Sequence, residues 1–465
     1  MAGTIPTELG TKPINTLIRQ YAVPGIIAMT ASSLYNMVDS IFIGHIPEVG
    51  SLAISGLAVT FPLMNISAAL GTLVGVGAAT MISVLLGQKN YEAAGKVLSN
   101  EVSLNIIVGL VFTFFTLLFI DPILRFFGAS DNTLPYARDY MTIIAIGNII
   151  THLYFGLNAV IRSSGNPRLA MGLTLFTVTT NAILDPVFIY VLKMGIQGAA
   201  IATVLCQTLA LSYSMRYFLD QDRFLHLPRK PFFRLDWRIA KDSLAIGMGP
   251  FLMNLASCIV VLFINNQLVR HGGDLALGAY GIVNRLSFLF IMIVMGFNQG
   301  MQPIAGYNYG ARQYSRVKEV FLKTAAWATV VCTVGFIISV FLSRPAVSIF
   351  TNDPELENIA ARGLRIMNIV FPIVGFQMVT TNLFQCLGMV QKSIFLSLSR
   401  QLLFLVPCVY ILPNLLQSEI GVWYSFPISD VIASILTAIL GLGLIRKLNR
   451  LKDGDDPSIL GSKIQ

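Results

Sequence analysis

The sequence predicts an all-α polytopic membrane protein, with twelve transmembrane helices in two six-helix lobes related by a parallel, pseudo-two-fold repeat. Three observations lead to this prediction: the composition, a succession of twelve apolar segments, and a similarity between the two halves. Of the 465 residues, 55% are hydrophobic and only 12% are charged, and the mean hydropathy is +0.71. Soluble domains carry about 25% charged residues, so this chain needs lipid to solvate its exterior.

The charge, the cysteines and the absence of catalytic motifs narrow the functional classes. A net charge of +9 also occurs in nucleic-acid-binding proteins, but in a membrane protein an excess of Lys and Arg marks cytoplasmic loops. We therefore expect no nucleic-acid partner. All five cysteines lie in apolar segments without a C-x-x-C pair, which indicates buried thiols. The sequence contains no P-loop, H-E-x-x-H or G-x-S-x-G motif, so neither an enzyme nor a cofactor is expected.

Twelve segments are apolar over about the 20 residues that a helix needs to cross a bilayer. In chain order they lie at 17–44, 52–84, 102–120, 136–161, 168–192, 196–217, 243–269, 275–305, 320–342, 363–387, 393–416 and 420–445. If the N-terminus is cytoplasmic, the loops on that side hold 24 Lys and Arg residues when nearby helix residues such as Arg19 and Arg400 are counted with them, and the opposite loops, counted in the same way, hold 7. This bias predicts a multi-pass protein whose N- and C-termini are both cytoplasmic.

A polar stretch divides the helices into two sets of six. It predicts a first lobe at 1–217, a cytoplasmic loop at 218–242, a second lobe at 243–450 and a cytoplasmic tail at 451–465. A shift of 223 residues superimposes LLGQKNY on NYGARQY, at the same ends of the helices at 52–84 and 275–305. Because each set has an even number of helices, the repeats would run parallel, with their axis along the membrane normal.

Charges inside the predicted helices need an explanation, because a charge at the bilayer centre costs at least about 2.5–3.5 kcal/mol. Asp39 lies about six residues, or about 9 Å, from the outer end of its helix, and Asp185 lies about eight residues, or about 12 Å, from the end of its own. Both belong to the first lobe, whose predicted helices offer them no basic partner. Two carboxyls in a low dielectric cannot both ionise cheaply, so the pair is predicted to bind H⁺ or, with nearby oxygens, Na⁺.

Polar neighbours support such a site. Tyr35 precedes Asp39 by one helical turn, Asn181 precedes Asp185 by the same spacing, and Thr203 lies at a similar depth in the helix at 196–217. The alternative is a structural polar cluster that holds three helices together. No other metal site is expected.

Two charges of the second lobe and one proline of the first also stand out. Arg285 and Asp430 lie about 11 and about 10 residues from the outer ends of their helices, and this equal depth suggests an intramembrane ion pair, either structural or involved in substrate access. Pro24 lies inside the first predicted helix, where a proline removes a backbone hydrogen bond and can kink the helix. It is a candidate hinge that moves when Asp39 changes charge, and a static bend is the alternative.

Neutral polar and flexible side chains gather in three helices of the second lobe. The candidates for lining a substrate cavity are Met253, Asn254, Gln299, Gln377 and Met378. Each of them alone is more commonly a helix-to-helix contact. Glycines spaced four apart, Gly71 with Gly75 and Gly296 with Gly300, indicate close helix packing.

Four motifs follow one another in the first half: YNMVDSIFIG after Pro24, then LLGQKNYEAAGKVL, GLNAVIRSSGNPR and NAILDP. In this order, and over nearly all of residues 14–450, the chain resembles the MATE family of multidrug and toxic-compound extrusion transporters. It is more similar to the DinF-like and MepA-like bacterial branch than to the NorM-like branch, because the helices at 243–269 and 363–387 contain no acidic residue.

The resemblance implies a secondary active antiporter that exports amphipathic, often cationic organic compounds in exchange for H⁺ or Na⁺, while its two lobes rock about a central cavity. It places Asp39, Asn181, Asp185 and Thr203 in the ion or proton site of the first lobe, with Tyr140 near its rim. We expect a monomer in the bacterial inner membrane, whose partners are the lipid bilayer and small amphipathic molecules.

Two other functions stay open. One is a flippase for lipid-linked glycans from a related membrane superfamily, which a hydrophilic and basic central cavity would favour. The other is an integral-membrane, lipid-modifying enzyme, which would need His or Asp residues clustered at one membrane face.

Overall fold

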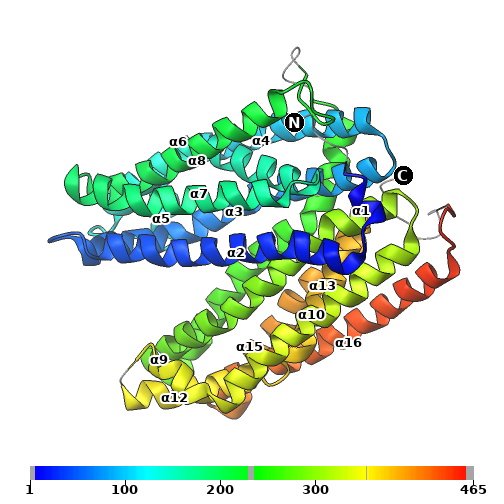
Figure 1. Cartoon of the computed structure of the whole chain (residues 1–465). Coiled ribbons are helices and arrows are strands. Elements are labelled where there is room, and N and C mark those ends of the chain that lie inside the picture. Colours follow the sequence, from blue (N-terminus) through cyan, green and yellow to red (C-terminus); the bar gives the residue numbers. More distant parts are fainter. Residues whose placement is uncertain (1–5, 229–234, 352, 457–465) are drawn as a thin grey trace. The chain divides into compact units, whose positions relative to one another are not determined.

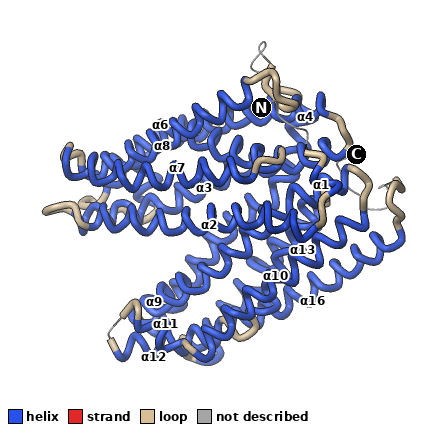
Figure 2. Tube along the Cα trace, in the orientation of Figure 1, coloured by secondary structure: helices blue, strands red, loops and turns tan. Residues whose placement is uncertain are grey.

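A computed structural model describes residues 6–228, 235–351 and 353–456, and Figure 1 shows the course of the chain. All regular elements among these residues are helical, as Figure 2 shows by colour. Ten helices are long and apolar enough to cross a membrane, and a pair bent by 55° can form an eleventh span. The predicted all-α membrane architecture is confirmed.

The first six spans come from the first half of the chain. They are α2 (Ile14–Gly44), α3 (Gly50–Gly87), α4 (Tyr91–Leu118), α6 (Leu134–Ser163), α7 (Pro167–Pro186) with the π-helix η1 (Val187–Val191), and α8 (Gly195–Leu219). With 31 residues, α2 is about 46 Å long and exceeds the bilayer core of about 30 Å. We count it, by its length, as a twelfth span beside the eleven that are also apolar enough among the described residues. Two short helices, α1 (Glu8–Thr11) and α5 (Ile120–Phe126), lie between them in sequence.

The second half begins with α9 (Trp237–Gly310), which breaks at Gly273 (φ 66°, ψ −164°) into two spans. Glycine adopts such a positive φ at little cost. The remaining elements are α10 (Tyr314–Phe341), α11 (Ser343–Ser348), the bent pair α12 (Pro354–Met367) and α13 (Phe371–Cys386), a span built from α14 (Val390–Leu398), η2 (Ser399–Leu405) and α15 (Val406–Leu416), and α16 (Ile420–Arg450).

The chain forms two compact units. Unit 1 contains residues 1–9 and 27–251, and unit 2 contains residues 10–26 and 252–465. The boundaries thus lie inside α1, α2 and α9, and the one in α2 lies two residues after Pro24. Part of the predicted loop at 218–242, residues 229–234, lies outside the described residues, as does the end of the predicted tail.

Glycines bring helices together within each unit. In unit 1, a Cβ atom added to Gly75 of α3 would lie 2.8 Å from the Cα atom of Gly156 in α6. In unit 2, a Cβ atom added to Gly296 of α9 would lie 2.5 Å from the Cα atom of Ile26 in α2. Real Cβ atoms do not approach backbone this closely, so the predicted close packing at these small residues is confirmed.

We expect Gly75→Ala to lower the stability of unit 1 by about 1–3 kcal/mol, because the added methyl group would push α3 away from α6. Gly172 of α7 is the matched control, since no atom lies within 4 Å of an added Cβ there. Gly172→Ala should leave stability unchanged or raise it by up to about 1 kcal/mol. Thermal unfolding in detergent measures both, and equal melting temperatures would refute the packing argument.

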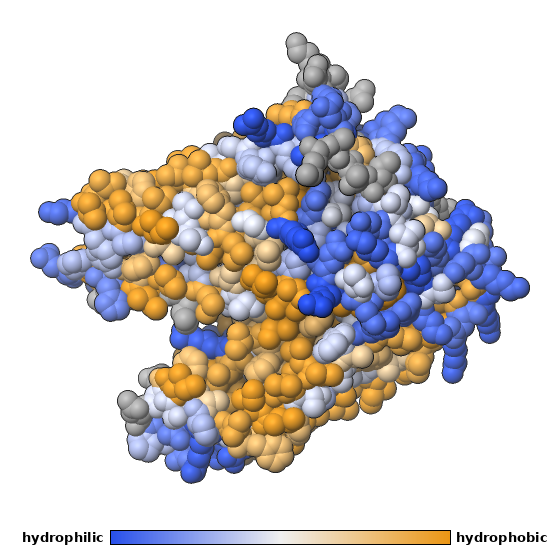
Figure 3. All heavy atoms as spheres, viewed as in Figure 1, coloured by the Kyte–Doolittle hydropathy of each residue, from blue (hydrophilic) through white to orange (hydrophobic). Residues whose placement is uncertain are grey.

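The surface of each unit suits a bilayer. In Figure 3, apolar side chains cover the flanks of the helices, and hydrophilic side chains gather at their ends. Large apolar residues on these flanks are well exposed, among them Phe61, Phe114, Phe341 and Ile439. Soluble monomers rarely expose contiguous apolar surface on this scale, so lipid is the medium that this exterior requires.

Candidate functional site

Four helices of unit 1 bring the predicted site residues together. The contributing residues are Tyr35 and Asp39 from α2, Tyr140 from α6, Asn181 and Asp185 from α7, and Thr203 from α8. Only 6% of the Asp39 surface is exposed, and Asp185 is fully buried. The residues chosen from depth and helical spacing, with Tyr140 from the family resemblance, therefore form one polar cluster, in which Tyr35 and Thr203 are half-buried and the others are buried.

Hydrogen bonds organise this cluster. The side-chain amide of Asn181 donates to Asp185 Oδ1 over 2.7 Å. The hydroxyl groups of Tyr35 and Thr203 lie 3.0 Å apart and link α2 to α8. The carboxyls of Asp39 and Asp185 lie within hydrogen-bonding reach of each other, so the two acids form one site rather than two.

The cluster holds negative charge without a cation to balance it. No basic side chain among the described residues forms an ion pair with either carboxyl, and Asp39 Oδ1, Asp185 Oδ2 and Asn181 Oδ1 are buried oxygens without a hydrogen-bond partner there. A buried, uncompensated carboxylate costs several kcal/mol. A proton shared by the two carboxyls, or a hard cation bound by the free oxygens, would remove this cost.

The residues that follow Asp185 fix α7 against α2. Pro186 has no backbone N–H to continue the ordinary helical pattern, and the chain passes into η1, a π-helical turn of a kind that is frequent at functional sites. In η1, the Tyr190 hydroxyl donates to the carbonyl oxygen of Phe42 over 2.6 Å, and the two rings pack edge to face. This contact holds the α2 backbone three residues beyond Asp39.

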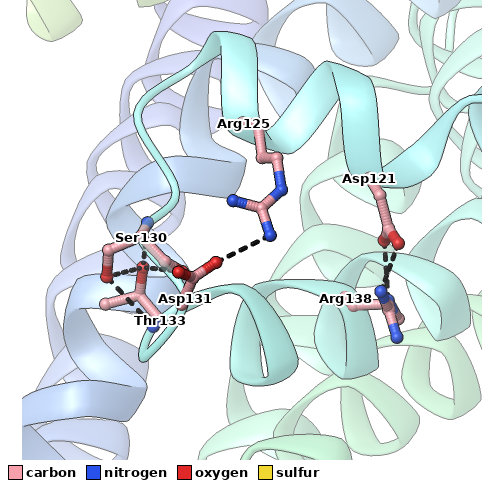
Figure 4. Close-up of polar contacts among 6 residues, drawn as sticks. All are labelled: Asp121, Arg125, Ser130, Asp131, Thr133 and Arg138. Carbon is pink, nitrogen blue, oxygen red and sulfur yellow. Dashed lines mark hydrogen bonds and ion pairs between the residues drawn. The ribbon is translucent and has the colours of Figure 1, made fainter.

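A polar corner lies at the start of α6, the helix that carries Tyr140. Figure 4 shows Arg138 of α6 paired with Asp121 of α5, with its Nε atom 2.7 Å from Asp121 Oδ1, and Arg125 paired with Asp131 over 2.8 Å. Both pairs are exposed, so solvent screens them. They link α5 to the start of α6 and to the loop between the two helices.

The predicted pair of Arg285 with Asp430 is wrong. In α16, Asp430 instead accepts a hydrogen bond from Nε of Arg400 over 2.8 Å, and Arg285 is exposed. The sequence-based charge count places Arg400 with the cytoplasmic residues, whereas the structure places it in η2, ten residues after the start of α14. A nearer arginine at matching depth therefore takes the place predicted for Arg285.

The remaining predicted residues lie in unit 2 or at its boundary. Pro24 lies inside α2, as predicted. The cavity candidates lie on α9 (Met253, Asn254, Gln299) and on α13 (Gln377, Met378). Two hollows of unit 2 have volumes of about 530 and 420 Å³, lined by Asn265 with Arg270 and by Arg344 with Arg362, respectively. Neither is lined by a cavity candidate, so the substrate cavity stays a prediction.

The sequence analysis missed a buried acid, Glu101. The predicted helix begins at residue 102, but α4 begins at Tyr91, and Glu101 is a buried residue inside it. The signal that would have found this start is Asn90, whose side chain accepts a hydrogen bond from the backbone N–H of Ala93. Asparagine is a preferred residue at this capping position.

Twelve spans, buried acids without basic partners and an internal repeat define a polytopic membrane protein of the transporter class. The sequence profile of the MatE family matches residues 24–187 and 246–411. These segments cover most of the chain, which therefore belongs to the MATE family of membrane transporters.

Curated relatives align over nearly the whole length. The multidrug export protein MepA of Staphylococcus haemolyticus (strain JCSC1435) is 27% identical over 428 residues, which are 92% of this chain and 93% of the relative. MepA of Staphylococcus aureus (strain MSSA476) is 28% identical over 435 residues, or 93% and 94% of the two chains.

Solved structures share the fold. An outward-facing structure of a multidrug resistance MATE family transporter of the MOP superfamily superimposes with a TM-score of 0.89 at 24% identity, over 97% of this chain and 100% of that chain. A MATE structure described as the bent conformation gives a TM-score of 0.89 at 25% identity, over 96% and 99% of the two chains. These structures support the twelve-helix, two-lobe architecture.

Proposed function

We propose that the protein is a multidrug efflux antiporter of the bacterial inner membrane, which exports amphipathic, often cationic compounds in exchange for H⁺, with Na⁺ as the alternative coupling ion. The observation that carries this proposal is the buried pair of Asp39 and Asp185, whose carboxyls lie within reach of each other and have no basic partner among the described residues. Relatives named multidrug export proteins support the class of substrate.

Coupling requires that the charge of the site favours one conformation over another. With a cation bound, the Asp39–Asp185 pair is stable in its buried environment, and without one it carries a charge that favours solvation. As ions enter the site from the outside and leave it to the cytoplasm, the acid pair would alternate between its cation-bound and cation-free states. The substrate would leave the cell during the part of the cycle that the ion gradient drives.

The α2 helix is suited to carry this change between the units. It bears Asp39 in its part that belongs to unit 1, whereas its residues 14–26, which include Pro24, belong to unit 2. A helix weakened by a proline bends at low cost. A change in charge at Asp39 would therefore bend α2 at Pro24, which supports the predicted hinge.

The experiment that tests this function is ethidium transport in everted membrane vesicles, with a pH gradient and, separately, a Na⁺ gradient. The lumen of an everted vesicle corresponds to the cell exterior, so an acidic lumen should drive ethidium into it. A response to Na⁺ alone would select the alternative ion. No transport under either gradient would refute drug export, and flipping of lipid-linked glycans would then be the function to measure.

A further inference from the structure

Besides Asp39 and Asp185, unit 1 has a third buried acid, Glu101 in α4. Only 1% of its surface is exposed, and its one hydrogen bond comes from the side-chain amide of Asn105, which donates to Oε1 over 2.5 Å. Glu101 Oε2 and Asn105 Oδ1 are buried and have no hydrogen-bond partner among the described residues. Buried polar atoms are nearly always satisfied, so these two oxygens indicate a ligand.

The carboxyl of Glu101 lies in a space that a glycine leaves open. A Cβ atom added to Gly156 of α6 would lie 1.8 Å from Glu101 Oε1 and 2.5 Å from the Asn105 amide nitrogen. The carboxyl is thus held directly against the backbone of α6. Any larger residue at this position would displace it.

From Gly156, a row of polar side chains extends along one face of α6. Asn148, His152 and Gly156 are spaced four residues apart and therefore lie above one another. Ser67 of α3 links the first two, because its hydroxyl donates to the Asn148 side chain and lies 3.2 Å from His152 Nε2. His152 is fully buried, and its Nδ1 atom has no partner among the described residues.

Toward its start, α6 also reaches the coupling site. Tyr140 lies eight residues, or about 12 Å, before Asn148, and it is close to Asp39 and Asp185. The distance along α6 from Tyr140 to Gly156 is about 24 Å. The helix thus connects the acid pair with Glu101 across most of the membrane thickness.

No charge on the neighbouring elements balances Glu101. The α3 helix contains no charged residue. The charged groups and the histidine on the other packed elements are Asp121 and Arg125 of α5, Arg138, Asp139, His152 and Arg162 of α6, and Arg238, Lys241 and Asp242 at the start of α9. Among the described residues, none of them forms an ion pair with Glu101. On α4 itself, Glu92 and Lys96 pair with each other over 2.8 Å.

We propose that Glu101 and Asn105 form a second proton-binding site in unit 1, from which protons taken up at Asp39 and Asp185 leave for the cytoplasm. This inference rests on the proposed function and on its orientation, in which the start of α4 is cytoplasmic. An imidazole can accept a proton on one nitrogen while it releases another, so His152 is the group that would pass the proton to Glu101 Oε2. Each transfer breaks one O–H or N–H bond and forms another.

The test is Glu101→Gln, which keeps the shape of the side chain but cannot carry a proton. We expect ethidium transport driven by a pH gradient to fall by about 10-fold or more, while the affinity of the purified protein for ethidium and its melting temperature stay near those of the wild type. Glu101→Asp, which keeps the acid, should restore part of the transport. Glu92→Gln, a fully exposed acid on the same helix, is the matched control and should transport normally.

Each outcome decides between the two proposals. If the wild type responds to the pH gradient and Glu101→Gln transports within about twofold of it, the second site is refuted and the proposed function stands. If the wild type responds to a Na⁺ gradient but not to a pH gradient, the second proton site is refuted and drug export stands. If it responds to neither gradient, the proposed function itself fails. If Glu101→Gln does not fold, infrared spectra of the wild type and Glu101→Asp decide. A protonated-carboxyl band that shifts in the Asp variant supports the site, and an unshifted band overturns it.

Discussion

Asp39→Asn and Asp185→Asn should each abolish ion-driven export of ethidium while the protein still folds. Asparagine preserves the shape of aspartate but can neither bind a proton nor supply negative charge for Na⁺. The buried amide needs no cation, so we expect melting temperatures close to that of the wild type. Transport should fall by about 100-fold or more, as for the loss of a group that must exchange a proton.

Because the two carboxyls lie close together, we also expect the effects of the two substitutions on transport to be non-additive. Groups that act as one unit give strongly non-additive losses, so the double variant should be no worse than either single variant. Asp121→Asn is the control, because this acid lies in the exposed corner at the start of α6 (Figure 4) and not at the coupling site. Transport that survives both substitutions would move the coupling site elsewhere.

Arg400→Met and Asp430→Leu should each destabilise unit 2 by about 3–5 kcal/mol, because either change leaves one charge buried without its partner. The double change Arg400→Met with Asp430→Leu should cost much less. An apolar pair of similar volume needs no desolvation of charge, and such replacements are often neutral. Thermal unfolding of the three variants in detergent, analysed as a double-mutant cycle, measures this coupling.

Arg285→Met is the control for the pair in unit 2. Because Arg285 is exposed and Asp430 is bound to Arg400, this change should alter stability by only about 0.5 kcal/mol or less. Equal destabilisation by Arg285→Met and Arg400→Met would contradict the observed pairing.

The helices and the buried acid cluster of unit 1 could be predicted because a single free-energy cost dominates each of them. Hydrocarbon accepts only long apolar helices, and this constraint set the number of spans. A charge in hydrocarbon is so costly that it demands a function, and this cost identified Asp39 and Asp185. Helical spacing then added Asn181 and Tyr35, which lie in the same cluster.

Two features could not be predicted in the same way: the arginine that pairs with Asp430, and the start of the helix that carries Glu101. Depth alone could not distinguish Arg400 from Arg285 as the partner of Asp430, because both are arginines in unit 2 and the choice depends on which helix face packs against α16. For Glu101, the hydropathy window placed the helix start where the apolar residues begin. The helix in fact starts eleven residues earlier, at the Asn90 cap.

One property of the internal repeat could be predicted from the sequence and another could not. A shift of 223 residues, read from sequence, relates the two halves, and it carries residues 10–26 onto 233–249. These nearly coincide with 237–251, the segment of α9 that belongs to unit 1. The symmetry was therefore visible in the sequence. The exchange of these two segments was not, because it depends on contacts at glycines such as Gly77, where an added Cβ would lie 2.0 Å from the Ser243 carbonyl oxygen.

The most direct test of proton coupling at Asp39 and Asp185 is to count the protons released when tetraphenylphosphonium binds to the purified protein in weakly buffered solution. If the acid pair is the coupling site, we expect release of about one proton or more per wild-type protein near neutral pH. We expect no release from the Asp39→Asn, Asp185→Asn double variant, which should still bind tetraphenylphosphonium. Equal release from the wild type and the double variant would show that the exchanged proton is bound elsewhere.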